Sequence, residues 1–551
     1  MTHLAALHRK LKTLSGAPLH PEVPGLCAQV QEGGIDRRSF LRTVALLGVS
    51  AASAKAFLGE DLIGSALAQT PKAGGKLRFA CAVQELKDPA LTTWIEASNL
   101  FRNSLEFLTE VDADNITHPY LAESWTPSED LKTWRFKLRP NVKWSNGDWF
   151  TTEDVAFNFK RWQDPASKSS NRTSFAMVKE VKVLNELEFE LILDRPVLSI
   201  PEMLYAYTCP KVHRKFDEQG GDWAKNPIGT GPFKLVEYAV SRTARFQKRP
   251  DYWGKADGNS ALLDEIAYID MGTDVAAHIA ALAAGQVDVL YRVTIAEIDL
   301  VQKLPNVTLL KENAAQTLVL RMQADQKPFD DIRVRKAVVL AADNAKMLQL
   351  AYRGQGVVGE NHHVAPFQPE YFKLPEVKRD VAAAKKLLAD AGHTNGIDLE
   401  LTLGNTQGKW EQDTAQVLQQ SLAEAGIRLK LNVLPAAQYW PIWDKVPFGL
   451  TYWAHRPLAV MTLDLAYRSG AAWNESHFAS KEFDAALDKA MAIVDPKARS
   501  KAMETVEKII QDAAVMVQPY WPANFSAISN KVQGHRAHPA HYFRMDRVWL
   551  S

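Results

Sequence analysis

The chain has 551 residues, of which 46% are hydrophobic, and its 65 Lys and Arg residues nearly balance 64 Asp and Glu residues. This composition is typical of a large folded protein and excludes a disordered, collagenous or disulfide-built chain. Both signs of charge are mixed along the sequence and the net charge is only +1, so no basic patch indicates a nucleic-acid partner.

The N-terminal residues follow the order of a bacterial export signal. Residues 36–42 read D-R-R-S-F-L-R, and the pair Arg37-Arg38 with the Phe-Leu that follows resembles the twin-arginine export signal. An uncharged, mildly apolar run covers residues 43–54, and small residues then end at 66–68. The order of basic, apolar and small residues predicts a leader that is cleaved from the mature protein.

The predicted leader covers residues 1–68, with cleavage after Ala68 and an alternative site after Ala54. The apolar run has 12 residues, which is too short to span about 30 Å of hydrocarbon as a helix. We therefore expect a soluble mature protein in the periplasm. The long segment before the arginine pair leaves open which codon starts the chain.

Period-two alternation of apolar residues comes next along the chain. Residues 134–144 read as strand, turn and strand around Pro140-Asn141, and residues 181–193 read as a second hairpin around 185–186. The stretch 105–221 is richer in such antiparallel signals than its flanks. We interpret it as an insertion into an α/β lobe.

Three later stretches each predict a helix followed by a strand. The helices at 276–284, 381–391 and 410–425 have apolar residues on one face, and the residues after each helix alternate as a strand. Each helix is followed by a glycine, which tolerates the left-handed cap that ends a helix. Alternating helices and strands of this length predict α/β layers.

We find no sequence motif of a known catalytic site. The GxSxG, GxxxxGK[ST], HExxH and GxGxxG patterns are all missing. The three cysteines, Cys27, Cys81 and Cys209, are too far apart for a redox or zinc motif and are interpreted as buried thiols. A Cys81–Cys209 disulfide is an open alternative for an exported protein.

The histidines offer two weak metal candidates. His535, His538 and His541 are spaced by three, but Pro539 interrupts a helix there, which favours a solvated C-terminal segment. His362 and His363 are adjacent and would point to opposite faces of a strand.

The residues from Leu121 to Arg161 carry a family resemblance. This block is similar to the signature of the family 5 extracellular solute-binding proteins, the peptide- and nickel-type receptors of ABC importers. The resemblance covers nearly all of the mature chain, from about 75 to 521. Further similar stretches follow in order at 228–233, 251–253, 281–288, 333–337, 384–392, 473–474 and 483–484.

The resemblance implies an α/β fold of the periplasmic binding protein-like type (class II), with two α/β lobes, a hinge and a small third domain. Its discontinuous layout places lobe I at 69–104, 222–311 and 517–551. The inserted extra domain is expected at 105–221 and lobe II at 312–516. The antiparallel signals coincide with the extra domain.

The function that the resemblance implies is binding, without catalysis and without a cofactor. The protein would capture a small solute between its lobes, close on it, and deliver it to a membrane permease driven by an ATPase. We expect a monomer that has no nucleic-acid partner. Two lobes that close on a solute would form the hinged receptor typical of this family.

The segment 452–458, which reads Y-W-A-H-R-P-L, gives information about the ligand. Peptide receptors of the family generally place an aspartate after a Trp-containing strand, where it pairs with the peptide ammonium. Here His455 and Arg456 follow Trp453, and a basic pair favours a carboxylate or phosphate on the solute. Asp464 is the alternative ammonium partner, so a peptide stays possible.

Further ligand-binding candidates come from the same resemblance, and each also has a structural interpretation. Trp453 is equally expected in the core, Arg456 on a surface loop, and Trp473 in a structural turn. The remaining candidates are Asn474 beside Trp473, Arg172 in the extra domain, and Tyr520 and Trp521 on the lobe I side.

Three alternatives remain open at this point. One is a metal-chelate receptor of the nickel type, in which histidines would contact a chelated ion. A second is a secreted metal-dependent hydrolase that uses His535, His538 and His541. A third is a receptor that acts as a chaperone or as a partner of a sensor.

Overall fold

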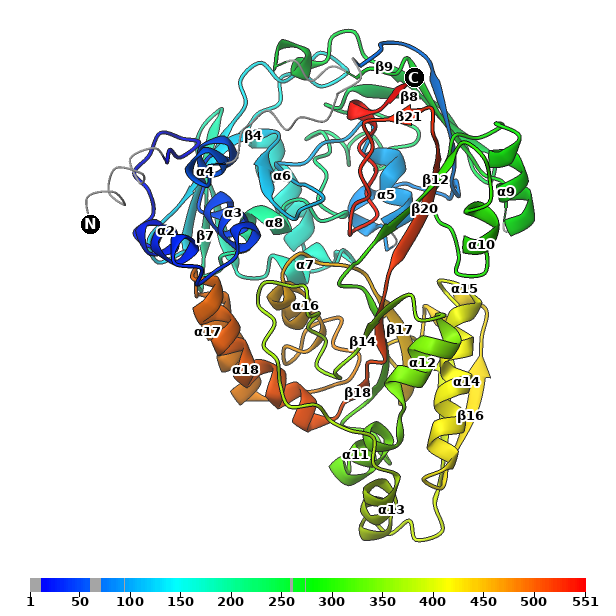
Figure 1. Ribbon diagram of the computed structural model, residues 1–551. Coiled ribbons are helices and arrows are strands. Elements are labelled where there is room, and N and C mark those ends of the chain that lie inside the picture. The colour runs from blue at the N-terminus through cyan, green and yellow to red at the C-terminus, as the bar shows by residue number, and fades with distance from the viewer. Residues whose placement is uncertain (1–10, 60–70, 94, 258–260, 273) are drawn as a thin grey trace. The chain divides into compact units, whose positions relative to one another are not determined.

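The computed structural model describes residues 11–59, 71–93, 95–257, 261–272 and 274–551 (Figure 1). The chain forms two compact units: unit 1 comprises Met1–Glu312 and Asn524–Ser551, and unit 2 comprises Asn313–Ala523. Each unit contains a mixed sheet with helices, which confirms the α/β fold class. The division into three domains stays a prediction.

A seven-stranded sheet forms the centre of unit 1. The central strand β1 is parallel to β10 and β11, while β8, β9, β12 and β20 complete the sheet in antiparallel pairs. The order is β12-β20-β11-β1-β10-β9-β8. The bounds are β1 Lys76–Ala80, β8 Phe233–Ala239, β9 Thr243–Lys248, β10 Glu265–Ile269, β11 Val289–Leu290, β12 Val307–Glu312 and β20 Asn524–Ser529.

Short helices and two small two-stranded sheets complete the body of unit 1. The sheets are β2-β3 and β21-β22, and both are antiparallel. The bounds are α5 Ile95–Phe101, β2 Thr109–Val111, β3 Thr117–Pro119, α8 Ile200–Met203, α9 Val275–Ala283, α10 Ile298–Val301, β21 Val532–Gln533 and β22 Trp549–Leu550.

Within unit 1, an antiparallel four-stranded sheet occupies the stretch expected to be an insertion. Its order is β4-β5-β7-β6, so β4 and β6 are the edge strands. The strands are β4 Ala122–Pro127, β5 Thr133–Leu138, β6 Val178–Asn185 and β7 Glu188–Leu193, and the accompanying helices are α6 Thr152–Gln163 and α7 Asn171–Ser174.

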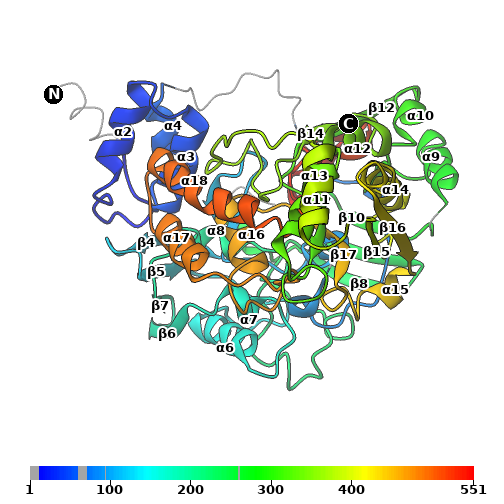
Figure 2. The same cartoon turned by 90° about the horizontal axis from the view of Figure 1, so that it is seen from below.

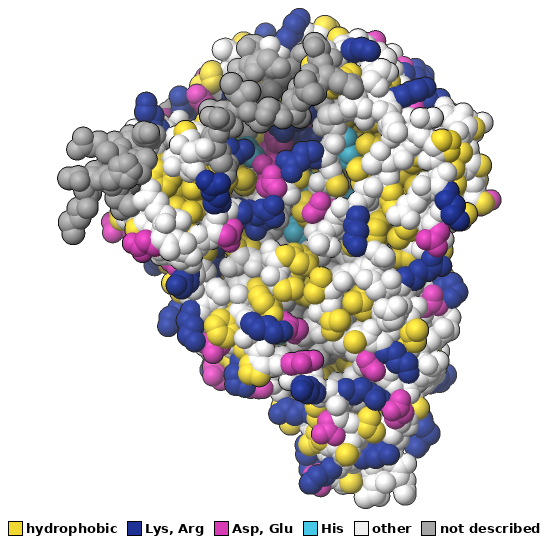
Figure 3. All heavy atoms as spheres, viewed as in Figure 1, with side chains coloured by type: hydrophobic (Ala, Val, Ile, Leu, Met, Phe, Trp, Pro, Cys, Tyr) yellow, Lys and Arg dark blue, Asp and Glu magenta, His cyan; other side chains and the backbone are white. Residues whose placement is uncertain are grey.

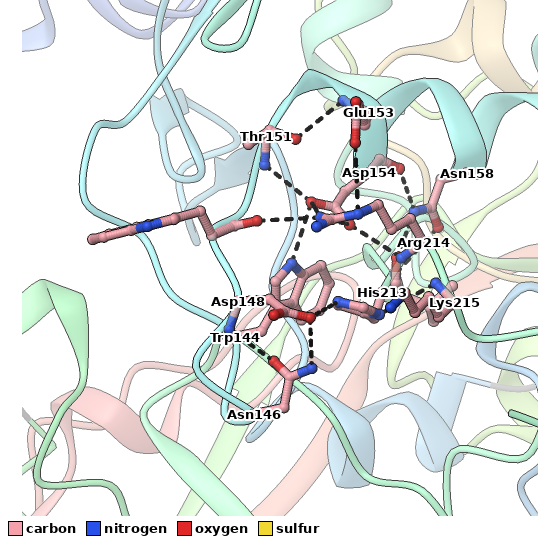
Figure 4. A network of polar contacts seen from close by, with 12 residues as sticks. Trp144, Asn146, Asp148, Thr151, Glu153, Asp154, Asn158, His213, Arg214 and Lys215 are labelled. Carbon is pink, nitrogen blue, oxygen red and sulfur yellow. Dashed lines mark hydrogen bonds and ion pairs between the residues drawn. The ribbon is translucent and has the colours of Figure 1, made fainter.

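The buried carboxylate of Asp154 fixes the start of α6 (Figure 4). It accepts the backbone N–H of Thr151 at 3.0 Å, which closes a capping box with the Thr151 side chain. The same carboxylate accepts the indole N–H of Trp144 at 3.3 Å and forms an ion pair with Arg214 at 3.2 Å. One residue therefore joins the helix, the preceding loop and the 213–215 segment.

Unit 2 is built on a five-stranded sheet in the order β16-β15-β17-β13-β18. Helices α11 and α13 lie side by side, and α14 packs on β16 (Figure 2). A second pair, β14-β19, is antiparallel. The strand bounds are β13 Thr317–Met322, β14 Gly356–Val358, β15 Ile397–Leu403, β16 Ile427–Val433, β17 Phe448–Trp453, β18 Met516–Val517 and β19 Tyr520–Pro522.

The helices of unit 2 are mostly amphipathic, and five of the eight are N-capped by a short polar side chain. Asp331, Asp380 and Ser480 each accept a backbone N–H at the start of a helix. The helix bounds are α11 Ile332–Ala341, α12 Asn344–Ala351, α13 Val381–Asp390, α14 Lys409–Ala423, α15 Ala436–Tyr439, α16 Ala459–Ala466, α17 Lys481–Met491 and α18 Pro496–Ala513.

Most of the predicted elements are confirmed, and one strand is not. The three helix-strand units form within a few residues of their expected bounds, and Gly285, Gly392 and Gly426 all have positive φ. The hairpin β6-β7 is antiparallel, as expected. The second strand expected at 142–144 is wrong: that stretch makes only an isolated bridge, Lys143↔Trp149, because β5 pairs with β4 and β7 instead.

Two expectations about side chains also need correction. Cys81 and Cys209 are buried free thiols, so they form no bridge. The C-terminal histidines are not solvated: His538 and His541 are 7% and 8% exposed, and the His535 ring stacks on Phe543 at 4.6 Å. The apolar surroundings lower the pKa of His538 to about 4, so this segment is part of the core.

The surface carries both signs of charge. On the face drawn in Figure 3, basic and acidic side chains are interspersed among hydrophobic ones, as the sequence suggests. A search of the described residues finds no helix that combines the length and the apolar character needed to cross a membrane.

Candidate functional site

Strand β17 ends at Trp453 and leads into the candidate segment of unit 2. The strand lies inside the sheet, antiparallel to β13 and next to β15, so its residues are almost all buried. Trp453 is 4% exposed, and its indole Nε1 donates to Glu475 Oε1 at 2.7 Å. A buried indole N–H needs such an acceptor.

Glu475 is a buried carboxylate that binds three side chains, and we call it the hub for this reason. Its Oε2 accepts from Arg321 Nε at 2.9 Å and from Thr451 Oγ1 at 2.7 Å. Burial raises the pKa of the Glu475 carboxyl above its ordinary value, although the charge of Arg321 and the hydrogen bonds oppose this effect. The ion pair and the hydrogen bonds together fix the position of the Trp453 ring.

Five rings form a continuous row through this part of unit 2. The centroid distances are 6.1 Å from Trp443 to Trp473, 5.9 Å from Trp473 to Trp453, 5.6 Å from Trp453 to His363 and 5.9 Å from His363 to Trp521. Trp443 and Trp473 are half-buried, whereas the other three rings are buried. The row therefore presents aromatic surface at its Trp443 end.

His363 connects two parts of the row. It is 2% exposed, has a φ of +59°, and its Nδ1 hydrogen-bonds the Tyr467 hydroxyl at 2.8 Å. Burial lowers the pKa of His363 to about 3, and the charges of Arg456 and His362 act in the same direction. The imidazole is therefore neutral at pH 7.

The two basic candidates after β17 differ in their surroundings. His455 is 8% exposed, and its Nδ1 accepts the backbone N–H of Ala315 at 2.9 Å, which points to a structural contact. Arg456 is half-buried, and its guanidinium carbon lies 5.7 Å from the ring centroid of Trp453. Its Nη1 donates to the Ala454 carbonyl at 3.4 Å.

Asp464 and Asn474 both have partners within unit 2. Asp464 is ion-paired with Arg468, one turn along from it, so an incoming ammonium would have to compete with that guanidinium. The Asn474 amide donates to the carbonyls of Arg468 at 3.1 Å and Phe478 at 2.6 Å. Asn474 thereby shapes the turn that carries Trp473 and Glu475.

Tyr520 and Trp521 lie in β19, which belongs to unit 2. Tyr520 is fully buried, and its hydroxyl hydrogen-bonds Thr414 Oγ1 at 2.6 Å. Trp521 is 2% exposed and packs in a small core with Ala315 and Ala365. The row of rings therefore reaches β19 through Trp521.

Arg172 lies in α7, in unit 1. Its side chain is exposed, and its Nη1 donates to the Pro165 carbonyl at 2.6 Å.

Unit 2 thus gathers Trp453, Trp473 and Trp521 in one row of rings, with Arg456 at Trp453. Sequence reasoning did not find Arg321 and Glu475, which lie 154 residues apart and meet only in the fold. His363 was considered only as half of a metal pair. The adjacency of Glu475 to the Trp473-Asn474 motif was the one signal available for the hub.

The chemistry available here is recognition. Half-buried aromatic rings can pack against an apolar group, and a guanidinium can pair with an anionic group. Among the described residues, no group of three or more His, Cys, Asp or Glu is placed to hold a metal ion.

Comparison with known proteins places this architecture in a family. The profile of the bacterial extracellular solute-binding proteins, family 5 Middle, matches residues 117–470. The periplasmic oligopeptide-binding protein OppA of Salmonella typhimurium is 26% identical over 496 residues, which is 82% of this chain and 88% of that protein.

Two solved structures are similar to this chain in fold. The periplasmic binding protein DppA of Helicobacter pylori, in complex with the peptide STSA, has a TM-score of 0.76 at 23% identity and covers 87% of this chain and 98% of its own. AgaA of A. tumefaciens R10, in complex with agropinic acid, also has a TM-score of 0.76 at 23% identity and covers 87% and 99%. Because the family profile spans more than half of the sequence, the chain belongs to family 5 of the bacterial extracellular solute-binding proteins.

Proposed function

We propose that this protein is the periplasmic receptor of an ABC importer for a small peptide or peptide-like solute that carries an anionic group. Family membership supports the receptor role, and the similar protein OppA is named for binding oligopeptides. The receptor would bind its solute without changing it and present it to a permease driven by an ATPase. The closing of two lobes on the solute remains an expectation from the family resemblance.

The observation that carries the anionic preference is the position of Arg456 directly after β17. It lies beside the face of Trp453, where a peptide receptor of this family generally has a carboxylate. Asp464, the alternative partner for an ammonium, is already ion-paired with Arg468. A positively charged end of a solute would therefore meet a guanidinium where a peptide receptor offers an acid.

The row of rings supports an organic solute rather than a bare ion. Trp443 and Trp473 are half-buried and can cover an apolar group of the solute. His363 is neutral at pH 7 and adds no charge of its own. One cation beside aromatic rings favours a solute with a carboxylate or phosphate and an organic body.

The first experiment identifies the solute. Protein purified from the periplasm is examined by native mass spectrometry for a bound compound. A peptide series, or an acidic organic compound, supports the proposal. A mass that requires a chelated metal would instead support the nickel-type receptor.

The second experiment tests Arg456 with that compound. We expect Arg456→Ala to weaken binding at least tenfold, because a hydrogen bond to a charged group contributes about 1.5–3 kcal/mol. Arg456→Lys should lose part of the affinity, since Lys cannot form two parallel bonds. Lys445→Ala, at an exposed position before β17, is the control. Unchanged affinity in Arg456→Ala would contradict the anionic preference and leave the family assignment intact.

We also propose that the twin-arginine route exports the protein and that residues 1–68 are its leader. The proposal rests on the sequence around Arg37 and Arg38, and its cleavage site at Ala68 lies outside the described residues. The alternative site, Ala54, lies within α4 (Ala51–Phe57).

A further inference from the structure

The predicted leader has a folded structure of its own. Residues 11–59 form three helices, α2 Val23–Gln31, α3 Arg37–Leu46 and α4 Ala51–Phe57, and the backbone of Thr13 bridges that of Val49. The rings of Phe40 and Phe57 pack at 5.5 Å. At the start of α3 the Asp36 side chain accepts the backbone N–H of Ser39, and at the start of α4 the Ser50 side chain accepts that of Ser53. We call residues 11–59 the N-terminal cap.

The cap lies against β4, an edge strand of the four-stranded sheet β4-β5-β7-β6 (Figure 1). We call this sheet the inserted sheet, after its expected place in the extra domain. The indole Nε1 of Trp125, in β4, donates to the Leu46 carbonyl at 2.9 Å. The Ser15 hydroxyl lies 2.8 Å from the Thr126 hydroxyl. An edge strand leaves backbone groups open to association, and a covering segment removes that hazard.

Gly48 is the position of closest approach. A Cβ on Gly48 would lie 2.3 Å from the Trp125 carbonyl oxygen, and the backbone has a φ of +77°. Only a glycine allows the cap backbone to come this near to β4.

Polar contacts hold the cap at a second place. Arg42, which is 8% exposed, donates from Nε to the Asp114 carbonyl at 2.8 Å. Arg38 forms an ion pair with the Asp114 carboxylate at 3.6 Å, and Arg536 also contacts that carboxylate, at 3.1 Å. His20 Nε2 lies 3.3 Å from the Glu129 carbonyl.

The first part of the apolar run of the export signal, residues 43–49, is buried, whereas Ser50, Ala51 and Ser53 are half-buried and Ala52 is exposed. Thr43, Val44, Ala45, Leu46, Leu47 and Val49 are each at most 2% exposed. Arg38 keeps 64% of its side chain exposed and Arg37 is exposed too, so the arginine pair lies at the surface while residues 43–49 do not. A translocase that binds both parts of the signal would find only one of them accessible.

We propose that the edge of the inserted sheet at β4 is a docking surface for this chain's own N-terminal cap, so that residues 43–49 of the signal are exposed only after undocking. The cap can dock only after β4 has folded and Trp125 is positioned to bind it. The exposure of the signal therefore depends on the folding of the inserted sheet. The gating role rests on the proposed twin-arginine export, whereas the docking itself does not.

Hydrogen exchange of the purified full-length chain tests the docking. We expect slow amide exchange at residues 43–49 in the wild type and at least tenfold faster exchange there in Gly48→Ala. The matched control is Gly33→Ala, because Gly33 has nearly the same φ of +74° but nothing within 4 Å of an added Cβ. Rates in Gly33→Ala should stay within threefold of the wild type. Wild-type exchange as fast as in an unfolded peptide would overturn the docking.

A cross-link gives an independent measurement of the docking. In the full-length chain with Ser15→Cys and Thr126→Cys, a disulfide should form on mild oxidation, because the two hydroxyls lie 2.8 Å apart. Either cysteine alone should give no such product. Failure of the double variant to cross-link while it remains folded would overturn the proposal, even if Gly48→Ala did not fold.

Pulse-chase of precursor processing in cells tests the gating. Thr126→Arg introduces a charge beside Ser15 and leaves the leader sequence intact. We expect it to shorten the half-life of the precursor at least twofold. The control is Glu180→Arg on β6, an exposed position at the opposite edge of the same sheet, which should leave the half-life unchanged. An unchanged or longer half-life in Thr126→Arg would overturn the gating role.

Processing in cells that lack the twin-arginine translocase separates the two proposals. Continued processing there would mean that the export route is wrong, while the exchange and cross-linking results would still decide the docking.

Discussion

At the scale of single residues, Glu475 is the side chain on which the candidate site depends most. It accepts hydrogen bonds from Arg321, Thr451 and Trp453, and both members of the ion pair are at most 3% exposed. Glu475→Ala leaves a buried guanidinium without its carboxylate, so we expect a loss of about 3–5 kcal/mol in the free energy of unfolding. Urea denaturation followed by tryptophan fluorescence measures this. Glu400→Ala, whose exposed pair with Lys430 contributes little, is the control.

A second prediction at this scale concerns the pH dependence of stability. Burial raises the pKa of Glu507, in α18, to about 9, and the neighbouring carboxylates of Glu360 and Glu370 add to the effect. The His362 Nδ1 lies 3.6 Å from its Oε2, and Phe372 N–H donates to its Oε1 at 3.0 Å. The carboxyl is therefore protonated in the folded protein at pH 7.

The sign of the pH effect follows from the raised pKa. The folded state holds this proton up to about pH 9 and the unfolded state only to about pH 4.5, so the free energy of unfolding falls as the pH rises between those values. The slope from one group is at most about 1.4 kcal/mol per pH unit. Glu507→Gln should flatten the slope between pH 5.5 and 8.5, and Glu504→Gln on the same helix should not. Equal slopes in all three proteins would contradict this assignment.

Sequence reasoning reached the candidate residues unevenly. The segment 452–458 was found because a basic pair follows a Trp-containing strand, which is a local pattern. Arg321 and Glu475 could not be found, since nothing in either local sequence reveals a partner 154 residues away. The C-terminal histidines were expected in solvent because Pro539 interrupts a helix there, yet the rings of His535 and His538 pack against Phe543 and Tyr542.

At the scale of elements, the start of α6 offers a sharp comparison between adjacent carboxylates. Asp154 is fully buried and binds Trp144, Thr151 and Arg214, whereas the Glu153 side chain is 74% exposed. Asp154→Ala should lower the free energy of unfolding by about 3 kcal/mol or more. The substitution removes the carboxylate that closes the capping box of α6, and it leaves buried hydrogen-bond donors unpaired. Glu153→Ala should change it by less than about 1 kcal/mol. Similar effects of the two substitutions in urea denaturation would contradict the role of the network.

Elements with strict periodicity were predictable, and those whose partners are distant in sequence were not. The helices α13 and α14 show their apolar faces in the sequence and end at glycines. The strand expected at 142–144 has the right residue types but finds no free edge, because β5 already pairs on both sides. The cap helices were not foreseen, because small and weakly apolar residues carry little periodic signal.

At the scale of the whole molecule, the export route is the testable property. Replacing Arg37 and Arg38 together with Lys keeps both charges but removes the guanidinium groups that the twin-arginine signal requires. We expect at least a tenfold fall in the processed periplasmic form, with accumulation of precursor, measured by fractionation and immunoblotting. Lys10→Arg with Lys12→Arg, in the same proposed leader, is the control. Normal processing of the double Lys variant would contradict the twin-arginine route.

The pairing of β12 with β20 has a consequence for the connectivity of the chain. Glu312, where unit 1 ends, is the register partner of Asn524, where unit 1 resumes. The intervening 313–523 segment therefore leaves unit 1 and returns to it at a single pair of register partners. A gene fragment that encodes residues 313–523 would yield one continuous polypeptide that holds every candidate ligand-binding residue except Arg172. In the rest of the gene, a short loop could join residue 312 to residue 524, because these two residues are neighbours in the sheet.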